Sequence, residues 1–196
     1  MMVGQLKRIS AWWCVMVLAL LLSACASPGR IAGTESVQAN ALDRTGRFAL
    51  NVQHLGGKRD AVQGGFAWHD DGRQLTLDLA NPLGSILARV QVLPGQAVMT
   101  RSNGQQERAA TPDALVELVL GSPMPVAGLR DWLQGSAGRG QASNLQTNDA
   151  GQTSSFTQDG WRVQLSRYDA HGPRLLQLNR NDSQRDISLR LIIDSE

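Results

Sequence analysis

The sequence contains little of what most enzymes need. It has two cysteines, Cys14 and Cys25, and three histidines in 196 residues. Gly-x-Ser-x-Gly, His-Glu-x-x-His and Cys-x-x-Cys motifs are all absent. Gly138-Arg139-Gly140 lacks the third glycine and the preceding strand of a nucleotide-binding loop. We therefore expect no catalytic residues, no metal site and no cofactor, and a periplasmic hydrolase finds no support.

The chain also lacks a membrane-spanning run and a basic stripe. The apolar run from Ala11 to Leu22 is shorter than the ~20 residues that a transmembrane helix requires. It follows Lys7-Arg8 and precedes small residues, which is typical of a secretory signal peptide covering residues 1–24. Removing it lowers the basic count from 19 to 17, equal to the 17 acidic residues. A neutral mature chain gives no electrostatic reason to bind nucleic acid.

The signal peptide ends in Leu22-Ser23-Ala24-Cys25, which resembles the lipobox of bacterial lipoproteins. On this interpretation Cys25 becomes the lipidated N-terminus, and its acyl chains hold the protein on a bilayer. The alternative is an ordinary signal peptide followed by a chance cysteine. Residues 25–44 are small and polar without periodicity, so we expect a flexible tether. With Cys25 lipidated, no disulfide is available to the exported domain.

From Arg47 onward, apolar and polar residues alternate with the period of a β-strand. Turn signals separate the alternating segments: Asp70-Asp71-Gly72, Asn81-Pro82-Leu83-Gly84, Pro94-Gly95, Ser102-Asn103-Gly104 and Asp159-Gly160. The last alternating run is Ile187, Leu189, Leu191 and Ile193. These features predict about ten or eleven antiparallel strands in a single domain over residues 45–196. A sheet of that size curls.

Two short helices interrupt this pattern. The first is predicted after Thr111, a suitable N-cap, with Pro112 at its first position and Gly121 at its end. Leu115, Leu118 and Val119 would share its apolar stripe. The second follows Pro125 and ends by Gly135, and residues 136–148 are predicted to form a surface loop. Both helices are too short to be stable alone, so we expect them to pack on the sheet.

Several motifs occur in an order that resembles a known family. They are Phe66-Ala67-Trp68, Leu-Ala-Asn-Pro-Leu-Gly at 79–84, Leu-Arg-Asp-Trp-Leu-Gln-Gly at 129–135, and Gln158-Asp159-Gly160-Trp161. Behind a lipobox, this order resembles the LolB family, the outer-membrane receptors of the bacterial lipoprotein localisation (Lol) pathway. The resemblance spans roughly residues 45–193. Each motif alone is short enough to occur by chance.

The resemblance implies a half-open, strongly curved antiparallel β-barrel whose short helices cap a hydrophobic cavity. It implies that the cavity receives the acyl chains of other lipoproteins from the periplasmic carrier LolA, and that the cargo leaves into the inner leaflet of the outer membrane. Ala26 is not the aspartate associated with retention in the inner membrane. We expect a monomer anchored to the outer membrane and facing the periplasm.

Leu83 is the most specific candidate site residue. Pro82 and Gly84 set a tight turn, and Leu83 is the one large apolar residue at its tip. From the residues alone, a lone turn leucine is expected to fold back onto the core. The resemblance implies instead that Leu83 is exposed and enters the bilayer.

The candidate acyl-chain cavity is assigned to apolar residues of the strands and helices, for each of which ordinary core packing is the alternative. Three of them are tryptophans, whose indole N–H groups we expect to find partners. The candidates are Phe66, Trp68, Leu77, Leu79, Ile86, Val90, Leu115, Leu118, Trp132, Leu133 and Trp161. A competing function is a structural accessory lipoprotein of an outer-membrane assembly machine. An open apolar cavity would favour the receptor, and a filled core would favour the accessory protein.

Overall fold

The computed structural model describes residues 41–138 and 140–195. These residues belong to one compact unit, residues 37–196. The signal peptide, Cys25 and nearly all of the tether lie outside the described residues. None of the helices among the described residues has the length and hydropathy needed to cross a membrane.

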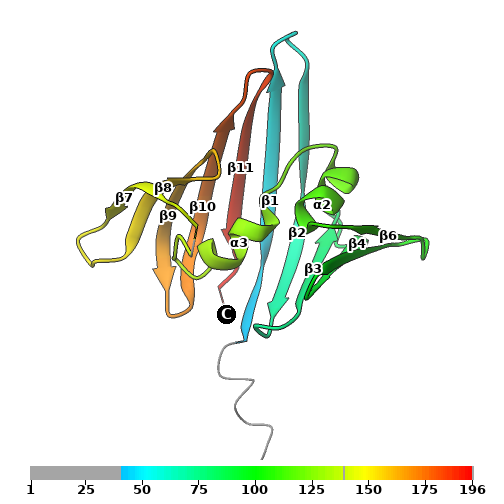
Figure 1. The fold of residues 1–196 in the computed structure, drawn as a ribbon, viewed down its shortest axis with the longest axis horizontal. Helices are drawn as coiled ribbons and strands as arrows, with labels where there is room; N and C mark the ends of the chain where they lie inside the picture. The colour runs from blue at the N-terminus through cyan, green and yellow to red at the C-terminus, as the bar shows by residue number, and fades with distance from the viewer. Residues whose placement is uncertain (1–40, 139, 196) are drawn as a thin grey trace, which may run out of the picture. The chain divides into compact units, whose positions relative to one another are not determined.

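The described residues form eleven strands and two short helices (Figure 1). In chain order the elements are β1 (Leu42–His54), β2 (Arg59–Asp70), β3 (Leu75–Ala80), β4 (Ile86–Leu93), β5 (Gln96–Arg101), β6 (Gln106–Ala109), α2 (Pro112–Leu120), α3 (Val126–Trp132), β7 (Ser143–Thr147), β8 (Thr153–Gln158), β9 (Trp161–Asp169), β10 (Gly172–Asn181) and β11 (Arg185–Ile193).

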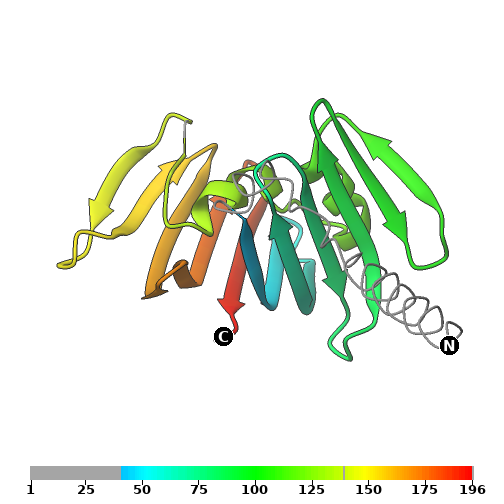
Figure 2. The ribbon, with the colours of Figure 1, turned by 90° about the horizontal axis from the view of Figure 1, so that it is seen from below.

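All eleven strands form one antiparallel sheet in the order β6-β5-β4-β3-β2-β1-β11-β10-β9-β8-β7. The first and last strands of the domain, β1 and β11, therefore pair at its centre, with Leu50 opposite Leu189. Figure 2 shows β6 and β7 at opposite edges, so the sheet does not close into a complete barrel. The predicted fold class, a half-open antiparallel sheet with two short helices, is confirmed.

Two glycines let neighbouring strands approach closely at the centre of this sheet. A Cβ atom at Gly46 would lie 2.2 Å from the carbonyl oxygen of Ile192, and one at Gly64 would lie 2.1 Å from that of Ala80. Each glycine stands opposite a phenylalanine on the neighbouring strand, Gly46 opposite Phe66 and Gly64 opposite Phe48. The aromatic rings cover the space that the missing side chains leave.

Both helices begin and end close to the predicted residues. Thr111 accepts a hydrogen bond from the backbone N–H of Ala114 at 3.4 Å, and Gly121 ends α2 in the left-handed conformation with φ of 69°. Pro at the first position of α2 needs no hydrogen-bond partner for its nitrogen. Figure 1 shows α2 and α3 lying over the same face of the sheet. Their apolar side chains therefore cover the buried face.

Two element boundaries differ from the prediction. Strand β1 begins at Leu42, inside the segment assigned to the tether, because Leu42 and Arg44 already point into the core. Strand β7 lies inside the predicted surface loop. All five of its side chains are exposed, so it shows no alternation that a sequence pattern could reveal. It is held only by its pairing with β8.

Candidate functional site

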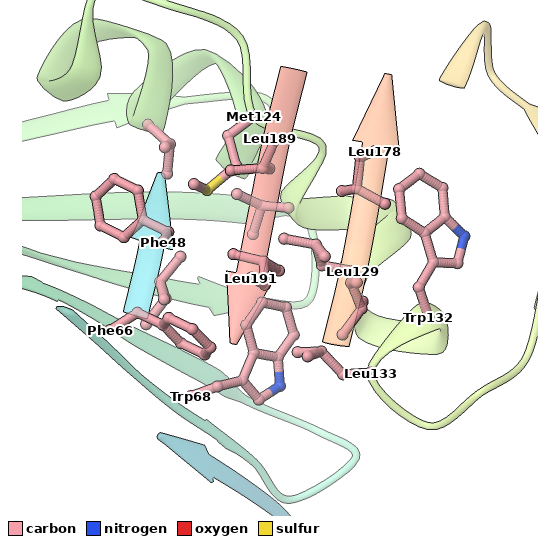
Figure 3. Close-up of a cluster of buried hydrophobic side chains, with 14 of the residues drawn as sticks. Phe48, Phe66, Trp68, Met124, Leu129, Trp132, Leu133, Leu178, Leu189 and Leu191 are labelled. Carbon is pink, nitrogen blue, oxygen red and sulfur yellow. The ribbon is translucent and has the colours of Figure 1, made fainter. Parts of the chain in front are cut away.

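The apolar interior between the sheet and the two helices is the first candidate site (Figure 3). Strands β1, β2 and β3 contribute alternate side chains to it, and Leu129 of α3 and the C-cap residue Leu133 cover them. At its centre is a small cavity with no polar side chain in its lining except the indole of Trp68. The cavity is lined by Phe48, Phe66, Trp68, Leu77, Leu79, Met124, Leu129, Leu133 and Leu191.

Five predicted cavity residues line this cavity: Phe66, Trp68, Leu77, Leu79 and Leu133. Four others, Val90, Leu115, Trp132 and Trp161, are buried in the same core without lining the cavity. The structure adds Phe48, Met124, Leu129 and Leu191. Phe48 and Leu191 belong to alternating strand patterns, so their burial could be predicted from sequence. Their contact with this particular cavity could not.

Leu118 is incorrectly assigned to the cavity, because 58% of it is exposed. The buried residues of α2 are Leu115, Val116 and Leu120. At 100° per residue, these three define a face whose centre lies more than 90° from Leu118. The sequence offered apolar residues on nearly every side of this helix, and packing selected a different stripe from the predicted one.

Ile86 is also incorrectly assigned, with 47% of it exposed. Leu79 pairs with Ala88, whereas the next residue, Ala80, pairs with Ile86, so the register shifts between β3 and β4. This irregularity leaves Leu87 as an extra residue and turns Ile86 away from the face that carries Ala88. The simple alternation of Ile86, Ala88 and Val90 therefore fails at its first member.

The interior is nearly filled in this structure. The cavity volume is about 10 Å³, room for no more than about one water molecule. The expected open apolar cavity is thus not open in this conformation. A larger hollow of about 770 Å³ exists elsewhere, and most of the residues that line it are polar or charged, among them Asn51, Arg59 and Arg162. A hydrocarbon chain bound there would lie beside charged side chains instead of in an apolar enclosure.

A small number of polar contacts hold the helices against the sheet. Arg130 of α3 donates two hydrogen bonds to Asp70, with Nε–Oδ2 at 2.6 Å and Nη2–Oδ1 at 2.7 Å. The indole N–H of Trp132 donates to Oε1 of Gln158 at 2.8 Å, which meets the expectation for that tryptophan. Because a helix of this length is unstable alone, these contacts and the apolar packing together keep α3 in place.

The two helices are also connected to each other. Asp113, at the start of α2, accepts a hydrogen bond from the backbone N–H of Ala127 in α3 at 2.9 Å. Burial raises the pKa of Asp113 above its ordinary value, although this hydrogen bond opposes the shift. Arg185 of β11 lies 3.8 Å from the carboxylate of Glu117 in α2. The helices thus form one connected cover over the apolar face.

The loop between β3 and β4 is the second candidate site. Oδ1 of Asn81 accepts hydrogen bonds from the backbone N–H groups of Leu83 at 2.9 Å and Ser85 at 3.0 Å. Gly84 adopts a φ of 87°, which favours glycine. The ordered turn holds Leu83 in water with 92% of it exposed. Residues 82–87 are all exposed, and we call their apolar members the loop cluster: Pro82, Leu83, Ile86 and Leu87.

Near the N-terminal end of β1, a buried arginine pairs with a carboxylate. Arg44 is only 3% exposed, and its Nη1 and Nη2 atoms donate to Asp169 at 2.7 and 2.9 Å. The hydrogen bonds from Arg44, with two from the backbone, hold the pKa of Asp169 well below its ordinary range. The pair joins the first strand of the sheet to the turn between β9 and β10.

Two of the three histidines lie beside carboxylates. His54 and His69 lie in strands, where they contact Asp60 at 2.9 Å and Asp43 at 2.5 Å. The hydrogen bond with Asp43 raises the pKa of His69 above its ordinary value. No group of three or more possible metal ligands is found among the described residues.

Comparisons with known proteins agree on one family. The family model described as "Outer membrane lipoprotein LolB" matches residues 40–195. Proteins named "Outer-membrane lipoprotein LolB" from Bordetella petrii and Bordetella pertussis are each 49% identical, covering 94% and 97% of this chain and 94% of their own. The protein of that name from Cupriavidus necator is 37% identical over 89% of this chain and 90% of its own.

A solved structure of a LolA superfamily protein from Nitrosomonas europaea aligns with a TM-score of 0.42 and 7% identity, covering 82% of this chain and 90% of that one. The sequence matches extend over the whole described domain, including the loop of Leu83 and both helices. The chain therefore belongs to the LolB family of outer membrane lipoproteins.

Proposed function

We propose that this protein accepts lipoproteins from the periplasmic carrier LolA by enclosing their acyl chains between the sheet and the helices α2 and α3, and then inserts them into the outer membrane. As a member of the LolB family it is an outer-membrane lipoprotein receptor of the Lol pathway, lipid-anchored and facing the periplasm. This is a family of lipoprotein-binding transport proteins, not of enzymes. Beyond this family role, we propose that LolA is the donor of the cargo and that the residues named below carry out its transfer.

The observation that carries the proposal is an apolar interior covered by two short helices. An unclosed sheet presents one continuous apolar face, and two short helices shield it from water. The cavity at its centre is lined almost entirely by hydrocarbon and aromatic groups. This chemistry suits an acyl chain, which has no polar atoms along its length.

The energetics explain why such a receptor is needed. Exposing three chains of about 14 methylenes to water, at ~0.8 kcal/mol each, costs roughly 30 kcal/mol. This cost exceeds the ~20 kcal/mol near which non-covalent affinities saturate. Acyl chains therefore cannot cross the periplasm without a protein that covers them. A receptor must cover the chains and still release them, because every ~1.4 kcal/mol of excess affinity slows release about tenfold. Non-directional aliphatic contacts meet both demands.

The nearly filled interior defines the conformational step. A cavity of about 10 Å³ cannot hold an acyl chain, so α2 and α3 have to move away from the sheet as cargo enters. The polar contacts of α3, Arg130 with Asp70 and Trp132 with Gln158, would then break or rearrange. The chains replace the helices as the cover of the apolar face, which limits the free energy that opening requires.

Leu83 is proposed to act at the release step. The turn presents it to solvent, where a large apolar side chain gains free energy by entering a bilayer. Ile86 and Leu87 extend the same exposed patch, so the loop cluster can insert as a unit. The lipidated Cys25 would keep this cluster near the membrane surface.

The direct test is transfer in vitro. The unlipidated mature chain, carrying Cys25→Ser, is mixed with LolA loaded with a radiolabelled lipoprotein, without ATP. We expect the cargo to move to this protein, as detected by photocrosslinking. If LolA keeps its cargo while the receptor is folded, the transfer function is wrong, and the structural accessory lipoprotein becomes the better account. The filled interior is the one structural observation that favours that alternative.

A further inference from the structure

Two buried hydrogen-bond donors at the edge of the apolar interior have no partner. Nε of Arg44 and Nε1 of Trp68 are both shielded from solvent, and neither donates to any of the described residues. For Trp68 this contradicts the expectation that each indole N–H finds a partner. A buried donor without an acceptor costs free energy, so native structures rarely retain one without a reason.

The two donors lie next to each other. Arg44 and Trp68 are directly paired across β1 and β2, and both side chains point to the buried face. Directly opposite residues of an antiparallel pair have Cβ atoms about 5 Å apart. Neighbouring strands therefore bring an arginine and an indole N–H together on a sheet face that is largely apolar.

The site adjoins the cavity and the end of α3. Trp68 lines the cavity together with Leu133, and Figure 3 shows its indole nitrogen on the side of Leu133. A Cβ atom at Gly172 would lie 3.1 Å from Nη2 of Arg44 and 2.3 Å from the carbonyl oxygen of Leu133. The guanidinium group, the indole and the last turn of α3 therefore meet at one end of the interior.

The orientation of Arg44 is fixed by its carboxylate partner. Each of its two Nη atoms donates to Asp169, and Nε is the side-chain nitrogen that has no partner among the described residues. Trp68 likewise offers a donor and no acceptor. A ligand group that fits this site must accept hydrogen bonds and must be attached to an apolar body that fits the cavity.

We propose that Arg44 and Trp68 bind the ester or amide carbonyl oxygens of the acyl chains of the cargo lipoprotein. This inference rests on the proposed acyl-chain binding. Each acyl chain ends in one carbonyl, an acceptor that loses its water when the chain enters the protein. Hydrogen bonds from Nε of Arg44 and Nε1 of Trp68 to these oxygens give the carbonyl acceptors and the two buried donors their missing partners. The hydrocarbon then extends along β1 and β2 toward Phe66 and Phe48, and the polar end of the lipid stays beside the end of α3.

The test compares two lipids that differ only in the carbonyl. One is a cysteinyl lipopeptide with two ester-linked palmitoyl chains, and the other is its dialkyl ether analogue. Binding to the mature chain carrying Cys25→Ser is measured by titration calorimetry. We expect the ester lipid to bind at least about fivefold more tightly, the effect of one hydrogen bond. Trp68→Phe should remove most of that preference, measured as the ratio of the ester affinity to the ether affinity in the variant.

Trp161→Phe is the matched control, since Trp161 is equally buried and lies outside the cavity lining. It should retain the ester preference. Equal binding of the two lipids by the unsubstituted protein, or an ester preference that survives in Trp68→Phe, would overturn the carbonyl site while leaving acyl-chain binding intact. Binding of neither lipid would overturn both the site and the proposed function.

A spectroscopic measurement keeps the inference testable if Trp68→Phe fails to fold. The ester carbonyls are labelled with ¹³C, and their infrared stretching band is compared between the bound lipid and the lipid in hydrocarbon solvent. Hydrogen bonding to Nε and Nε1 lowers the stretching frequency, so a downshifted band is expected. A band at the frequency of the hydrocarbon solution would contradict the proposal.

Discussion

At the scale of single residues, Leu83 shows how a turn can hold an apolar side chain in water. Asn81 accepts two backbone hydrogen bonds within the loop, so the turn is ordered while the leucine at its tip packs against nothing. Stability does not require a leucine here. Its large exposed surface is therefore best explained by a partner that it meets, and a bilayer is that partner in the proposed function.

Leu83→Glu should leave the fold and the uptake of cargo intact and block insertion into membranes. A charged side chain gains nothing from entering the hydrocarbon layer. The measurement is the fraction of radiolabelled lipoprotein recovered in liposomes. Leu145→Glu is the control, because Leu145 is another exposed leucine, on the edge strand β7. Normal delivery by Leu83→Glu, or an equal loss in Leu145→Glu, would contradict the assignment.

The pair of Arg44 and Asp169 makes a prediction about pH. The pKa of Asp169 is lower in the folded protein than in the unfolded chain, so the unfolded state binds the proton more tightly. The resulting stability is present above about pH 4 and is lost as the pH falls toward the folded-state pKa. Asp169→Asn should therefore lower the free energy of unfolding by about 1–3 kcal/mol at neutral pH.

The difference between Asp169→Asn and the unsubstituted protein should shrink on acidification. Urea unfolding at pH 7 and at pH 3 measures it. A difference that stays constant, or that grows as the pH falls, would show that the pair contributes no stability through the carboxylate.

At the scale of elements, α3 depends on contacts outside itself. Its seven residues cannot form a stable helix alone. Asp70→Asn removes the charge that receives both hydrogen bonds of Arg130. We expect a loss of about 1–2 kcal/mol in the free energy of unfolding. The amides of α3 should also exchange hydrogen faster, and acyl lipid should bind faster.

Asp78→Asn is the matched control for this prediction. Asp78 receives two hydrogen bonds from Arg89 with the same geometry, at 2.6 and 2.7 Å, but both residues are on strands. Its replacement should leave hydrogen exchange in α3 unchanged. If Asp70→Asn also leaves that exchange unchanged, the ion pair does not hold the helix.

Gly128 provides a steric test of the same helix. A Cβ atom there would lie 2.6 Å from the six-membered ring of Trp132. Gly128→Ala would ordinarily favour a helix by about 1 kcal/mol, but here it should displace the indole and break its hydrogen bond to Gln158. We expect a net destabilisation of about 1–3 kcal/mol, measured by thermal unfolding. A stabilised variant would show that Trp132 can move without cost.

The positions of helices and strands could be predicted from the sequence better than which side of each is buried. Thr111 and Gly121 cap α2 through local contacts, and Pro125 and Gly135 flank α3, so both helices could be predicted from sequence. Ile86 is exposed because the register shifts between β3 and β4. Leu118 is exposed because the sheet covers a different side of α2. Both are long-range effects that a one-dimensional pattern does not contain. Strand β7 was missed because it buries no side chain.

At the scale of the whole domain, the two helices shield the apolar face of the open sheet from water, whereas in a closed barrel additional strands would shield it. The edges β6 and β7 stay apart, and α2 and α3 cover the apolar face between them. Covering by short helices is easier to reverse than closure by strand pairing, since few backbone hydrogen bonds join the helices to the sheet. Sequence could indicate the apolar face, but the volume under the cover depends on side-chain packing.

The central claim is that acyl chains lie inside the domain, and photocrosslinking from two positions on β2 tests it most directly. A benzophenone amino acid replaces Phe66, which is buried, or Gln63, which is exposed on the opposite face of the same strand. LolA then delivers a lipoprotein with radiolabelled fatty acids to the mature chain carrying Cys25→Ser. The account predicts labelled crosslinks from position 66 and none from position 63. Transfer of the cargo without crosslinks from position 66, or with equal crosslinks from both positions, would contradict it.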